Sequence, residues 1–219
     1  MTMEEHIDDR PTELEPMTLP DVVRVVFSGP AAFVSFARAY LTRQGPPAFY
    51  LAAWLLGMDG VAGALELEFL TTGTHIVDNW FHAWLRIVFA GVAAGVVRYW
   101  LVGTLFHGVV LLSGGRGPAR TSRYLFLYAA LPVVVVELAV KVVQMLVYGN
   151  GYFAGLTNPS FDGAAGGVMM GAFVYTAILC YAGMRGLMNA PRTRSLLVIG
   201  LLGVVLVWFA LAFFFRGGA

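Results

Sequence analysis

The residues of this sequence most able to do chemistry are four charged side chains inside long apolar segments: Asp59, Arg98, Glu137 and Lys141. Glu137 and Lys141 interrupt the run LPVVVVELAVKVVQMLVY four residues apart, so they share one face of a helix. A charge at the centre of a bilayer costs about 2.5–3.5 kcal/mol on the insertion scale. Charges in such positions therefore indicate internal ion pairs or paths for protons and ions.

These four charges lie at similar predicted depths on three consecutive apolar segments. Asp59, Arg98 and Glu137 each lie about 12–13 residues, or ~18–20 Å, from the inner end of their segment. Because the four formal charges sum to zero, we predict an internal cluster in which each charge is paired. We favour an ion-pair network that fixes helix register. A proton or ion path, and contact with a lipid or another subunit, are the open alternatives.

The elements that must position these charges are membrane-spanning helices. The 219-residue chain is 58% hydrophobic and 12% charged, whereas a soluble domain is about 45–50% apolar and 25% charged. A helix crosses a bilayer in about 20 residues. Five segments meet this requirement, so we predict an all-α, polytopic fold with spans at about 47–65, 84–111, 124–147, 163–184 and 195–215.

Arginine residues alternate between the predicted loops and give the orientation. Basic residues are enriched in cytoplasmic loops. This pattern predicts a cytoplasmic N-terminus and an extracytoplasmic C-terminus in a bacterial inner membrane, and only Arg216 opposes it. The loop arginines precede the first span (Arg10, Arg24, Arg38, Arg43), separate the second from the third (Arg116, Arg120, Arg123), and separate the fourth from the fifth (Arg185, Arg192, Arg194).

The region before the first span divides into two parts. Residues 1–20 are strongly acidic and are predicted to be a disordered cytoplasmic tail. Residues 21–46 contain SGPAAFVSFARAYLTR, in which Pro30 suits a first helical turn and Phe33 and Phe36 begin an apolar stripe. We predict an interfacial amphipathic helix on the cytoplasmic leaflet, preceding the bundle of 47–219. A helix packed against that bundle is the alternative.

Glycine residues recur every fourth position in two of the predicted spans. Gly91 and Gly95 share one helix face, and so do Gly163, Gly167 and Gly171. Small residues at this spacing let helix backbones approach closely. We favour packing inside the chain, and contact between chains is the alternative.

Recognised catalytic and cofactor motifs are missing from the sequence. It has neither a Walker-type loop, nor HExxH, nor GxSxG, nor a nucleic-acid signature, and Cys180 is its single cysteine. His75, Asp78 and His82 share a helical spacing that makes a metal site conceivable, but we favour interfacial anchoring for this segment. We therefore predict no enzymatic activity and no cofactor.

The order of several short motifs resembles the Yip domain family, named for Ypt/Rab-interacting proteins, in its prokaryotic form. The motifs are SGPAAF before the first span, HGVVLLSGGRG at the end of the second, and TSRYLFLYAALP at the start of the third. The positions that carry the resemblance are Pro30, Phe33, His107, Gly114, Gly115, Tyr128 and Pro132. The resemblance implies the fold and its topology. For a prokaryotic member it supplies no biochemical activity that could be carried over to this chain.

These inferences lead to one expected function and one alternative. We expect a non-enzymatic membrane scaffold or accessory subunit, with the lipid bilayer and other membrane subunits, or further copies of the chain, as partners. The alternative is a small transporter or channel that moves protons or ions along the charged cluster.

Overall fold

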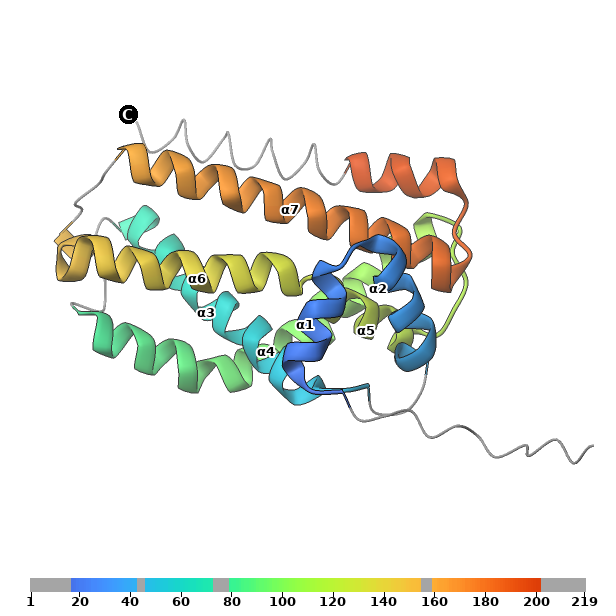
Figure 1. The fold of residues 1–219 in the computed structure, drawn as a ribbon, viewed down its shortest axis with the longest axis horizontal. Coiled ribbons are helices and arrows are strands. Elements are labelled where there is room, and N and C mark those ends of the chain that lie inside the picture. Colours follow the sequence, from blue (N-terminus) through green and yellow to red (C-terminus); the bar gives the residue numbers. More distant parts are fainter. Residues whose placement is uncertain (1–16, 43–45, 73–78, 155–158, 202–219) are drawn as a thin grey trace, which may run out of the picture.

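The structure is a computed structural model that describes residues 17–42, 46–72, 79–154 and 159–201, and the regular elements in these ranges are all helices (Figure 1). A further helical stretch at 192–201 follows α7. The elements are α1 (Leu19–Phe27), α2 (Pro30–Phe36), the π-helical turn η1 (Ala37–Leu41), α3 (Phe49–Thr72), α4 (Trp80–Leu112), α5 (Ala119–Ala129), α6 (Leu131–Tyr148), the 3-10 turn η2 (Gly149–Ala154) and α7 (Pro159–Met188).

Three helical segments in the described ranges are long and apolar enough to cross a membrane: Trp80–Leu112, Ala119–Tyr152 and Ser160–Met188. They coincide with the second, third and fourth predicted spans. The apolar part of α3, Phe49–Leu65, is shorter and coincides with the first. Most of the fifth predicted span and the acidic residues 1–16 lie outside the described residues. The all-helical fold is therefore confirmed for the described residues.

The third spanning segment is divided at Ala130 into α5 and α6. Pro132 lies in the first turn of α6 and has no N–H to donate to the Tyr128 carbonyl. Helical hydrogen bonding resumes when the N–H of Val134 donates to the Ala130 carbonyl at 3.1 Å. This interruption separates the arginine-rich start of the segment from the part that carries Glu137.

Helices α3 and α4 pack closely because glycines remove side chains from their contact. A Cβ atom at Gly57 would overlap the Gly91 carbonyl, and one at Gly95 would overlap the Ala53 carbonyl. The indole N–H of Trp54 on α3 also donates to the Val88 carbonyl on α4 at 2.9 Å. This close approach brings the facing polar side chains of the two helices within reach of each other.

The N-terminal helices lie against the rest of the bundle (Figure 1): α1 contacts α6, α2 contacts α7, and η1 contacts α5 and α7. Phe33 and Phe36 are buried, and the Phe36 ring meets Tyr128 with centroids 5.5 Å apart. Arg38 Nε donates to the Gly186 carbonyl at 3.2 Å. The apolar stripe of the predicted amphipathic segment therefore contacts the protein, as in the alternative of a helix packed against the bundle. This region, predicted as one segment, is divided at Gly29 into α1 and α2.

Candidate functional site

An ion pair between α3 and α4 forms the centre of the candidate site. Arg98 donates through Nη1 to Asp59 Oδ2 and, at 2.7 Å, to the Leu56 carbonyl. The Asp59 side chain is 8% exposed and that of Arg98 is 35% exposed. Gly60 makes room for this contact, because a Cβ atom there would lie 2.6 Å from Arg98 Cδ. Arg98 therefore links two helices through one charged and one neutral acceptor.

Glu137 brings α6 to the same place. Glu137 lines the same pocket as Asp59 and Arg98. Asp59 Oδ1 is buried and accepts no hydrogen bond from the described part of the chain.

Lys141 lies one turn beyond Glu137 on α6 and is 5% exposed. The structure thus joins Asp59 to Arg98 directly and places Glu137 and Lys141 on α6, which packs against α3.

A pocket of about 640 Å³, which we call the polar pocket, opens beside this cluster. Its walls include small residues of α3 and α4, and the Arg98 side chain that lines it is 35% exposed. Arg86, an exposed residue of α4, also lines it and was not predicted from the sequence. The sequence did contain a hint of Arg86, because this residue is a second arginine, beside Arg98, within the predicted second span. The residues that define the polar pocket are Asp59, Gly63, Arg86, Ala94, Val97, Arg98 and Glu137.

The two glycine series have different surroundings. Gly91 and Gly95 are buried in the contact between α3 and α4. A Cβ atom at Gly163, Gly167 or Gly171 would meet no atom of the described residues within 4 Å. The glycine face of α7 therefore does not pack against the other described helices.

The motif residues from the family resemblance build one end of the bundle. His107 Nδ1 lies 2.9 Å from Ser122 Oγ and connects α4 with α5. The Tyr128 hydroxyl donates to the Pro47 carbonyl just before α3. Gly114 has a φ of +76°, which favours glycine, and the N–H of Gly115 closes the turn by donating to the Val110 carbonyl at 2.9 Å. These contacts hold helices and turns together, so we assign these residues a structural role.

The conceivable metal site falls mostly outside the described residues, which exclude His75 and Asp78. His82 lies in the first turn of α4, where its backbone N–H donates to the Asn79 side chain at 3.0 Å. Within the described residues, His, Cys, Asp and Glu side chains form no group of three that could hold a metal ion.

A comparison with known protein families tests the family resemblance that the motif residues suggested. The Yip1 domain pattern matches residues 21–214, nearly the whole chain. The chain belongs to the Yip1 domain family. Together with its long apolar helices, this membership makes it a membrane protein of Yip1 type. No curated protein and no solved structure matched the chain.

Proposed function

We propose that this Yip1-domain protein is a non-enzymatic accessory subunit or scaffold that receives a polar part of another membrane protein in its polar pocket. The single observation that carries this proposal is the polar pocket between α3, α4 and α6, which is lined by charged side chains and leaves that of Arg98 35% exposed. Charged side chains at membrane depth face a bundle interior, a water-filled cavity or a partner. A partner helix with a polar side chain satisfies this requirement.

The charges and the walls of the polar pocket fit such a helix. The Arg98 side chain is one-third exposed, and Arg86 is exposed on the same helix. Ala94 and Gly63 in the walls leave space for side chains of an incoming helix. A polar group on that helix could accept hydrogen bonds from the arginines.

The proposed topology has five spans, a cytoplasmic N-terminus and an extracytoplasmic C-terminus in a bacterial inner membrane. The alternating arginines support it. The N-terminal segment belongs on the cytoplasmic side, with Arg24 and Arg38 exposed towards the headgroups.

The test is site-specific crosslinking in intact membranes. A photoreactive residue at Val97, which lines the polar pocket, is expected to give one discrete adduct mapping to a membrane-embedded peptide. Leu105 on the same helix is 64% exposed and lies outside this pocket, so it is the matched control. The Asp59→Asn/Arg98→Leu variant should abolish the Val97 adduct. Adducts with lipid alone, or equal adducts from both positions, would contradict a partner site.

The carboxyl pair supports a second candidate, transport of protons or ions. Asp59 Oδ1 accepts no hydrogen bond within the described residues, and Glu137 lines the same polar pocket. This arrangement could hold and release a proton. The purified chain in liposomes would then carry a proton flux that Glu137→Gln abolishes without unfolding it. A flux equal to that of empty liposomes removes this candidate.

A further inference from the structure

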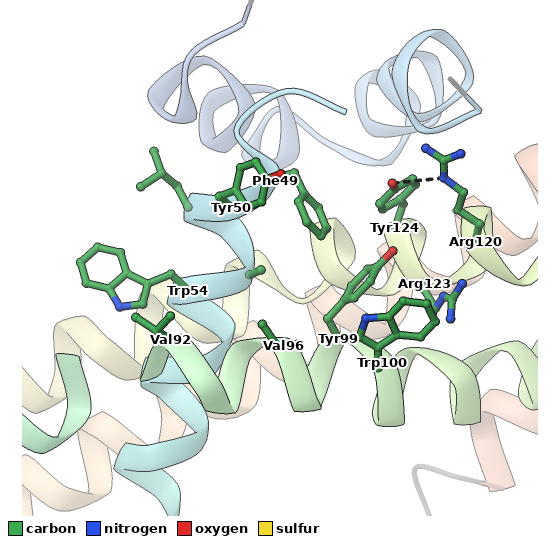
Figure 2. A pocket seen from close by; sticks show the side chains of 12 residues that line it. Phe49, Tyr50, Trp54, Val92, Val96, Tyr99, Trp100, Arg120, Arg123 and Tyr124 are labelled. Atoms are coloured by element: carbon green, nitrogen blue, oxygen red, sulfur yellow. Dashed lines mark hydrogen bonds between the residues drawn. The ribbon is translucent and has the colours of Figure 1, made fainter. Parts of the chain in front are cut away.

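A second pocket, of about 590 Å³, lies where α3, α4 and α5 meet (Figure 2). It is separate from the charged cluster, and we call it the aromatic pocket. One end is polar and the other is apolar (Figure 2). The residues that define it are Trp54, Tyr99, Trp100, Arg120, Arg123 and Tyr124.

Two arginines from the first half of α5 form the polar end. The Arg123 guanidinium lies over the Trp100 ring, 3.8 Å from its centroid. Arg123 Nε is buried, and within the described residues it has no hydrogen-bond acceptor. Arg120 is exposed, and its Nε donates to the Tyr124 hydroxyl at 3.2 Å. Among the described residues that line the pocket, none is acidic. The two arginines therefore have no counter-ion within the pocket lining, and a bound anion would supply one.

The other end of the aromatic pocket is apolar and continues onto the outer surface of α4. Val92 and Val96 are 60% and 56% exposed. Trp54 uses its indole N–H on the Val88 carbonyl, so its ring offers the pocket apolar surface. This apolar end can contact a hydrocarbon chain, whereas a small soluble anion would gain no favourable contact from it.

We propose that the aromatic pocket binds an anionic phospholipid. The phosphodiester accepts hydrogen bonds from Arg120 and Arg123, and one acyl chain follows Trp54, Val92 and Val96. Guanidinium groups match phosphate oxygens in pairs, and basic pockets between spanning helices recognise anionic headgroups. The tyrosine and tryptophan rings between the two ends are the residue types enriched at headgroup level. This site is independent of the partner proposed for the polar pocket.

The test uses the full chain in mild detergent, with binding of phosphatidylglycerol measured by native mass spectrometry and thermal shift. Phosphatidylglycerol should bind at least tenfold more tightly than phosphatidylcholine. The Arg120→Gln/Arg123→Gln variant should lose at least tenfold in phosphatidylglycerol affinity. Arg120→Gln alone changes an exposed side chain, so it keeps the test valid if the double variant does not fold. It should weaken binding at least threefold.

Three control arms distinguish binding in the aromatic pocket from general attraction between arginines and phosphate. Arg116→Gln/Arg192→Gln removes two exposed arginines that do not line the aromatic pocket, and it should bind phosphatidylglycerol like the parent protein. Glycerol 3-phosphate carries the same phosphate chemistry without acyl chains and should produce no thermal shift. Equal binding of both phospholipids, equal losses in the control variant, or full stabilisation by glycerol 3-phosphate would each overturn the proposal.

Discussion

A carboxylate and a guanidinium can share the interior of a membrane protein only while they neutralise each other. Asp59 and Arg98 do so across α3 and α4, with the Leu56 carbonyl as a second acceptor for Arg98. Desolvation of both ions offsets much of their attraction. The pair therefore contributes little net stability, yet removal of one member leaves the other charge without its counter-ion.

That asymmetry gives a prediction for the ion pair. Asp59→Asn should lower the free energy of unfolding by about 3 kcal/mol, the low end of the range for a broken buried pair, because Arg98 is partly exposed. Asp59→Asn/Arg98→Leu should cost less than the single change, since no charge is stranded. Thermal unfolding in detergent measures both variants. A double variant less stable than Asp59→Asn would contradict the ion-pair account.

Asp21 gives a prediction for pH. The Thr18 hydroxyl and N–H both donate to its carboxylate and lower the pKa of Asp21 from its ordinary value. A lowered folded-state pKa means that this capping interaction is complete above about pH 4, the ordinary value for Asp, and disappears as the pH falls through the folded-state pKa.

The measurement is the difference in melting temperature between the parent protein and Asp21→Ala, recorded from pH 7 to pH 3. The parent should melt higher at pH 7, and the difference should shrink as the solution becomes acidic. Thr18→Ala, which removes the hydroxyl donor but keeps the N–H, should show a smaller difference of the same sign. A difference that stays constant with pH would rule out this role for Asp21.

At the scale of elements, the spacing between α3 and α4 determines whether the charged residues meet. Gly95→Ala places a methyl group against the Ala53 carbonyl and should force the two helices apart. Overpacking commonly costs about 1–3 kcal/mol, and we expect at least the upper value because the obstacle is backbone. Gly108→Ala in the same helix is the matched control, since a Cβ atom there meets no described atom within 4 Å. Thermal unfolding should separate the two variants clearly, and equal melting temperatures would contradict close glycine packing.

At the scale of the whole molecule, the arginine pattern predicts the orientation of the chain. Cys180 is the single cysteine, so Cys180→Ala provides a background for labelling. In inside-out vesicles, an impermeant maleimide should react with Thr2→Cys and leave Ala219→Cys unlabelled. In cells with a permeable outer membrane, the reactivities should be reversed. Labelling of both positions from the same side would mean an even number of spans.

The sequence by itself determined the membrane class, the all-helical character of the described residues and the positions of the second, third and fourth spanning segments. Hydropathy and helical length act within one segment, so they can be evaluated without knowledge of neighbouring helices. The charged residues could be selected in the same way, because the cost of burying each charge is local. The family motifs indicated the Yip1 domain for the same reason, since their order lies along the chain.

Tertiary structure alone decided which groups meet. Arg98 donates to Asp59 rather than to Glu137, and Phe33 is buried against other parts of the protein. The sequence could not predict either contact, because both depend on how the helices rotate and approach one another. Arg123 became a candidate lipid-binding residue only when α5 was placed beside Trp100 of α4. Helical periodicity specifies the faces of each helix, but the packing between helices selects which faces touch.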